Sequence, residues 1–173
     1  MRSSTTKSTS NNYLNYRHNI KNGDLLIWDT GTVGALGAIY GWLIQIFTRS
    51  QYIHVAIALV ENDRVMFVEA ARPEVQISML STAGSFYHIP MNIEWKDSYT
   101  TILKSRLGEK YSILEAIRSY LFKPKKDRQW QCAELLNWFY KTIGIKADFG
   151  FTPKSVIQAA MEHTGNGMYF VGG

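Results

Sequence analysis

Hydrophobic residues are spaced in two different ways along this 173-residue chain, and the spacing changes near its middle. Between residues 24 and 90 the apolar residues come in short runs bounded by Gly, Asn, Asp and Pro, which predicts β-strands at 24–28, 53–60, 65–70, 75–80 and 86–90. The second and third runs flank a polar turn at 61–64, which is typical of a β-hairpin.

The second half of the chain has the three- and four-residue spacing of helices that bury one face. A first helix is predicted around 111–121, a second from Cys132 to Ile143 with Gly144 as its C-terminal cap, and a third from Thr152-Pro153 to about Glu162. Strands that precede helices, instead of alternating with them, predict an α+β fold with an antiparallel sheet.

Residues 33–47 form the longest apolar stretch, and its large side chains also recur at helical spacing. The stretch is shorter than the ~20 residues that a membrane span needs. We expect a helix that packs on the core. The alternative is a helix that lies at a lipid interface, which would make a membrane surface a partner.

The two ends of the chain are expected to lie outside the folded domain. Residues 1–20 are rich in Ser, Thr and Asn and lack the apolar run of a secretory signal, whereas 164–173 are rich in Gly. The predicted division is a polar N-terminal tail (1–20), a catalytic domain (21–163) and a C-terminal tail (164–173). We expect a partner protein to hold the N-terminal tail.

The amino-acid composition limits which cofactor sites and which binding partners the chain can have. One cysteine excludes internal disulfides and multi-cysteine zinc sites, and four dispersed histidines show no metal-ligand spacing, so neither a metal nor an organic cofactor is expected. The net charge of +5 favours anionic surfaces, among them cell-wall polymers, acidic lipids and nucleic acid. Nucleic acid is the weakest of these predictions, because the basic residues are dispersed and not interleaved with aromatic residues.

The single cysteine, Cys132, lies at the predicted start of a helix, where unpaired backbone N–H groups favour the thiolate. If Val60 pairs with Val65 in the hairpin, His54 and Glu69 lie on one sheet face as diagonal neighbours. A glutamate side chain spans that distance, so Glu69 can orient His54 while His54 serves a thiol. A one-residue slip in register would put the two on opposite faces.

Other interpretations of the same residues remain open. The amide of Cys132 is the natural donor to an oxyanion, with Gln131 or Tyr52 as a second donor from the side chain. A buried cysteine is often an inert apolar residue, and a histidine on a strand is often structural. The combination of the three candidates, not any one of them, favours catalysis.

Five short segments (22–26, 50–58, 68–70, 108–111 and 131–135) together resemble the circularly permuted branch of the NlpC-type papain-like cysteine hydrolases, in which histidine precedes cysteine. The likeness covers roughly residues 20–145. It implies a permuted papain-like fold with Cys132 as nucleophile, His54 as base and Glu69 as the third polar member. It also implies that Tyr111 lines the cleft.

The family resemblance implies a cysteine amidase or peptidase, with the stem peptides of peptidoglycan as leading substrate. Lysis, a secretion machine or a phage particle would bring such an enzyme to a cell wall. The location stays open, with virion-associated and cytoplasmic as the two alternatives. One alternative is a lipid acyl hydrolase or acyltransferase similar to lecithin:retinol acyltransferase. Another is a structural or virion-associated module that has lost catalysis.

Overall fold

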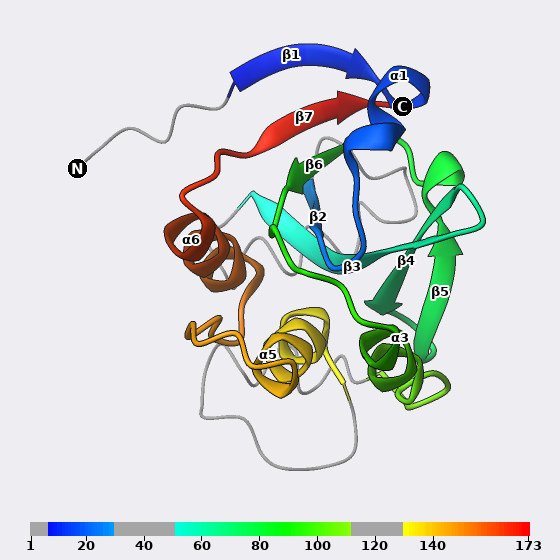
Figure 1. The fold of residues 1–173 in the computed structure, drawn as a ribbon, viewed down its shortest axis with the longest axis vertical. Coiled ribbons are helices and arrows are strands. Elements are labelled where there is room, and N and C mark those ends of the chain that lie inside the picture. Colours follow the sequence, from blue (N-terminus) through cyan, green and yellow to red (C-terminus); the bar gives the residue numbers. More distant parts are fainter. Residues whose placement is uncertain (1–6, 30–50, 112–129) are drawn as a thin grey trace.

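A computed structural model describes residues 7–29, 51–111 and 130–173. In it the N-terminal segment and the C-terminal strand lie side by side (Figure 1). The predicted helices at 33–47 and 111–121, apart from Tyr111, lie outside the described residues. Tyr111 itself is extended: it forms an isolated parallel bridge with Trp130 instead of starting a helix.

The described strands form one sheet in the order β1-β7-β6-β2-β3-β4-β5. All neighbours are antiparallel except β1 and β7, which pair in parallel. The bounds are β1 Lys7–Asn12, β2 Leu25–Asp29, β3 Tyr52–Glu61, β4 Arg64–Ala70, β5 Val75–Met79, β6 Phe86–Ile89 and β7 Tyr169–Gly172. The five predicted strands are therefore present within a residue or two of their expected ends.

The β3–β4 hairpin has the predicted register, with Val60 opposite Val65. Its two central residues, Asn62 and Asp63, have φ of 50° and 60°. Positive φ at both positions is what a type I′ turn requires, and the twist of that turn matches the twist of the strands that it joins. This turn chemistry fixes which residues of β3 and β4 share a face.

The described helices are α1 Tyr13–Tyr16, α3 Asp97–Lys104, α5 Cys132–Thr142 and α6 Pro153–Thr164, with 3-10 turns at Arg17–Asn19 and Leu80–Thr82. Within the described ranges none is long and apolar enough to cross a membrane. The predicted caps are confirmed: Thr152 caps α6, and Gly144 follows α5 with φ 89°. Helix α3 had not been predicted.

The sheet carries a core on each face. Helices α5 and α6 pack on one face through fully buried side chains that include Leu135, Leu136, Phe139 and Val156. The other face is covered by the N-terminal segment, whose Tyr16 and Ile20 are buried beside Trp28 and Phe86. The molecule is α+β with an antiparallel sheet packed against helices, as the sequence predicted.

The predicted boundaries at 1–20 and 164–173 are corrected by the structure. Lys7–Asn12 and Tyr169–Gly172 are sheet strands, and Val171 is fully buried. Both segments are polar on average, so the prediction overlooked the isolated apolar residues in them. These are Tyr16 and Ile20 near the N-terminus and Met168 and Val171 near the C-terminus. Each side chain becomes part of the core because a neighbouring strand offers it a surface, which composition does not reveal.

The turn into β2 is set by the motif at 22–24. Asn22 accepts a hydrogen bond from the Val60 backbone N–H at 2.6 Å, and the Tyr140 hydroxyl donates to the Gly23 carbonyl at 3.0 Å. Gly23 has φ 84°, and a Cβ there would lie 2.9 Å from the side chains of Ile93 and Trp95. Glycine is needed at this position for both conformation and space.

Candidate active site

Cys132 is the first residue of α5 and is 8% exposed. The preceding residue, Gln131, is extended and forms the N-cap of the helix, and it is buried. The first-turn N–H groups of an α-helix have no partner within the helix, so they surround the sulfur with partial positive charge. The predicted position of Cys132 at a helix start is therefore confirmed.

A cluster of stacked side chains holds the segment that leads to Cys132. The Arg106 guanidinium lies 4.4 Å from the ring centre of Trp138 and 5.3 Å from that of Trp130. Glu109 pairs with Arg106 at 2.9 Å and accepts the indole N–H of Trp130. The Trp130 backbone N–H also donates to the Lys110 carbonyl at 2.8 Å. These contacts fix the chain two residues before the sulfur.

His54 and Glu69 lie near the open end of the β3–β4 hairpin, and their side chains meet. Nε2 of His54 is 2.6 Å from Oε2 of Glu69, with the two side chains 23% and 11% exposed. The other carboxylate oxygen accepts from Ser78 Oγ at 2.7 Å and from Gln76 Nε2 at 3.1 Å. Because Nε2 is committed to Glu69, Nδ1 is the ring nitrogen left for another partner.

Cys132 interacts electrostatically with the same ring. Burial opposes the charge on the His54 ring, but the interactions with Cys132 and with Glu69 outweigh burial and raise the pKa of His54 to about 10. Conversely, burial opposes the Glu69 charge, yet His54, Ser78 and Gln76 lower the pKa of Glu69 to about 2. The environment thus favours the charged forms of both His54 and Glu69.

Tyr111 lies close enough to Cys132 to interact with it electrostatically. Burial and the Cys132 charge raise the pKa of Tyr111 above its ordinary value, while Arg72 partly opposes the shift. Its backbone N–H donates to the Pro73 carbonyl at 3.0 Å, next to Arg72. The phenol therefore stays protonated beside the sulfur, where it can donate a hydrogen bond.

The Tyr52 ring packs edge-on against Tyr87, with 6.1 Å between ring centres, and it packs against the same apolar core that contains Cys132. Gln131 directly precedes Cys132 in the chain and is buried. Both remain predictions as substrate-binding residues.

Sequence reasoning missed the residues that surround the His54–Glu69 pair. Glu69 pairs with Gln76 and Phe67 with Ser78 across β4 and β5, so Gln76 and Ser78 share the face of Glu69. The alternating pattern of 75–79 contained this signal, because residues two apart on a strand share a face. Trp28 also packs on His54, with 5.6 Å between ring centres, and is placed by the β2–β3 register.

A metal centre is not evident in the part of the chain that the structure describes: it contains no group of three or more His, Cys, Asp or Glu side chains arranged to hold an ion. The His54 ring is hydrogen-bonded to the Glu69 carboxylate and interacts electrostatically with Cys132.

No protein-family model matches this chain. No curated protein matches it at a significant level either. Among solved structures, the fold is similar to that of the metalloprotein YiiX of Escherichia coli O157:H7, assigned to DUF1105, with a TM-score of 0.50 at 16% sequence identity. The match covers 70% of this chain and 65% of that chain, so it spans about two thirds of the neighbour and shows a likeness of fold alone.

Proposed function

We propose that the protein is a cysteine hydrolase with a permuted papain-like fold, in which Cys132 is the nucleophile, His54 the acid and base, and Glu69 the orienting carboxylate. The observation that carries the proposal is the 2.6 Å contact between His54 and Glu69, on an imidazole that also interacts electrostatically with Cys132. A nucleophile, a base in reach and a third group that orients the base are the signature of covalent catalysis.

The reaction begins with the thiolate of Cys132 and the imidazolium of His54. The sulfur attacks the carbonyl carbon of an amide, and a tetrahedral oxyanion forms, which the backbone N–H of Cys132 can stabilise at the helix start. The imidazolium gives its proton to the leaving nitrogen, the C–N bond breaks, and an amine and a thioester remain.

Water then completes the cycle. Neutral His54 removes a proton from water, the resulting hydroxide equivalent attacks the thioester carbonyl, and the C–S bond breaks. The products are a carboxylic acid and the regenerated thiolate–imidazolium pair. Glu69 keeps the ring in one orientation throughout and stabilises the charged form, and it needs no proton of its own.

For the substrate we propose an amide bond in a peptide of the bacterial cell wall. The net charge of +5 suits an anionic polymer. The Tyr111 hydroxyl stays protonated and interacts with Cys132, so it is a suitable hydrogen-bond donor to the carbonyl of a bound peptide.

The first experiment uses the fact that Cys132 is the only cysteine, so that every thiol label reports on this residue. Wild type should react with iodoacetamide faster than a free thiol at pH 7, and His54→Ala should slow the reaction at least tenfold. His163→Ala, a change of an exposed histidine on α6, is the matched control and should have no effect.

The second experiment identifies the bond. Purified peptidoglycan is incubated with wild type or with Cys132→Ala, and the released fragments are analysed by mass spectrometry. Peptides with new amine and carboxyl ends, absent with Cys132→Ala, are the expected result. Hydrolysis of a phospholipid with intact peptidoglycan would assign the lipid-acting alternative. Ordinary thiol reactivity with neither substrate cleaved would assign a non-catalytic module.

A further inference from the structure

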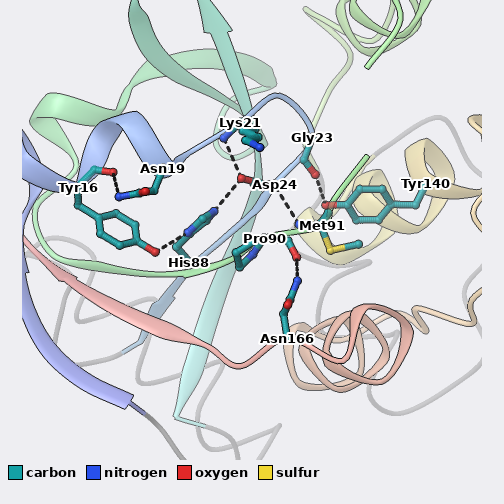
Figure 2. A network of polar contacts seen from close by, with 10 residues as sticks. All are labelled: Tyr16, Asn19, Lys21, Gly23, Asp24, His88, Pro90, Met91, Tyr140 and Asn166. Atoms are coloured by element: carbon teal, nitrogen blue, oxygen red, sulfur yellow. Dashed lines mark hydrogen bonds and ion pairs between the residues drawn. The ribbon is translucent and has the colours of Figure 1, made fainter. Parts of the chain in front are cut away.

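A second polar site lies around the N-terminal segment, where Figure 2 shows Tyr16, His88 and Asp24 linked by hydrogen bonds. A pocket of about 460 Å³ opens here, within the roughly 300–1,000 Å³ range of small-molecule sites. None of the candidate catalytic residues lines it. The lining residues with exposed or half-buried polar side chains are His18, Asn19, Lys21, Asn92 and Tyr169.

The floor of the pocket is a buried network built on Asp24 and His88, which are 2% and 0% exposed. Asp24 accepts hydrogen bonds from His88 Nε2 at 2.8 Å, from the Lys21 backbone N–H at 2.8 Å and from the Met91 backbone N–H at 2.8 Å. Nδ1 of His88 is 2.9 Å from the Tyr16 hydroxyl (Figure 2). This network is satisfied internally, so it forms a rigid floor.

Tyr16 lines the pocket, and its hydroxyl belongs to the hydrogen-bonded network of the floor. Burial, followed by the charges of Tyr169 and Asp24, raises the pKa of Tyr16 to about 12, so its hydroxyl remains protonated. A tyrosine with a raised pKa is a poor nucleophile and a stable hydrogen-bonding group. The Tyr16–His88–Asp24 chain therefore suits binding and not a second catalytic centre.

The charges at the pocket argue against an ionic ligand. Lys21 and Asp24 contribute one formal charge of each sign, and the Asp24 charge reaches the hydroxyl of Tyr16. An anion would be repelled by the carboxylate at the floor, and a cation would be repelled by the exposed ammonium of Lys21 at the mouth. A neutral polar ligand meets neither penalty.

The asparagine and tyrosine side chains of the pocket are suited to bind the hydroxyl groups of a sugar. Asparagine amides and tyrosine hydroxyls both donate and accept hydrogen bonds, as sugar hydroxyls do. No hydrogen bond among the described residues occupies the Asn92 amide or the Tyr169 hydroxyl. Tyr169 is half-buried, so it can also offer an apolar ring to the C–H face of a sugar.

We infer that this pocket binds one or two units of a neutral sugar chain, with Asn92 and Tyr169 as hydrogen-bonding groups and the Asp24–His88–Tyr16 network as a fixed floor. The site lies on the sheet face covered by the N-terminal segment, whereas α5 packs on the other face. It does not depend on whether Cys132 is catalytic.

The test is calorimetric titration of Cys132→Ala protein with the neutral trisaccharide of N-acetylglucosamine, because this variant cannot cleave amides in the course of the titration. Tyr169→Phe keeps the ring and removes the hydroxyl. Asn92→Gly removes the amide and tolerates the backbone φ of 55° at this position. Leu14→Ala, at a side chain that is 67% exposed on α1, is the matched control.

The expected result is saturable binding of the trisaccharide that each pocket variant weakens about three- to tenfold, the effect of one neutral hydrogen bond. Leu14→Ala should bind as the parent does, and thermal melts should show that all variants are folded. Absence of sugar binding, binding unchanged by both pocket variants, or binding of inorganic phosphate in place of sugar would each overturn the inference. Thiol labelling of wild type tests the catalytic proposal separately.

Discussion

The carboxylate of Glu69 should control the charge of His54, and Glu69→Gln is the change that tests it. The variant keeps the size of the side chain. Ser78 and Gln76 both donate to Oε1, so the amide oxygen will stay with these donors and the amide NH₂ will face His54 Nε2. Two donors then oppose each other, which favours a neutral ring whose Nε2 is unprotonated.

The size of the effect follows from the lost interaction. A hydrogen bond to a charged group is worth about 1.5–3 kcal/mol, and one pKa unit corresponds to about 1.4 kcal/mol. The pKa of His54, about 10 in the native protein, should therefore fall by roughly 1–2 units in the variant. A ring held in the wrong tautomer should also slow turnover on the order of 10³–10⁴-fold.

The assay is an NMR titration of the His54 ring, combined with the rate of Cys132 alkylation from pH 5 to 10. Glu61→Gln is the matched control: Glu61 pairs with Lys104 at 2.6 Å on the surface, far along the hairpin from His54. A His54 midpoint that is the same in wild type and Glu69→Gln would refute the assignment of Glu69 as the group that holds the imidazolium.

Three further outcomes are expected. The lowered pKa of Glu69 stabilises the folded state above pH 4.5, and this contribution is lost as pH falls towards about 2, so Glu69→Gln should flatten the acid side of a plot of Tm against pH. The raised pKa of His54 stabilises the protein below pH 6.5, and urea titrations should show this contribution disappearing as pH rises through about 10. Gly23→Ala should lower the free energy of unfolding by about 1–3 kcal/mol in chemical denaturation, because its Cβ meets Ile93 and Trp95 at a positive φ; unchanged stability would contradict the reasoning.

Much of the fold could be predicted because its strands, helices and turns depend on the spacing of residues that are close together in the sequence. Strand and helix periods, the polar turn at 61–64 and the caps at Gly144 and Thr152 each depend on residues close together in the chain. The diagonal relation of His54 and Glu69 could also be predicted, since a hairpin with a known turn has a defined register.

The packing across the sheet was decided by the tertiary structure. The order of the sheet brings β7, near the C-terminus, between β1 and β6, and this makes core residues of segments that look polar on average. Helix α3 was missed because it is only eight residues long, and its apolar residues Tyr99, Ile102 and Leu103 span little more than one turn, too few to establish a period.

The candidate site divides in the same way. The sequence by itself determined that a cysteine begins a helix and that a histidine and a glutamate share one face of a hairpin. Only the tertiary structure decided that α5 brings the sulfur to that histidine, that Gln76 and Ser78 support Glu69, and that His88 and Asp24 meet beneath Tyr16. The physical reason is that contacts between distant segments depend on how buried surfaces fit together, and the spacing of residues along one segment contains no information about that fit.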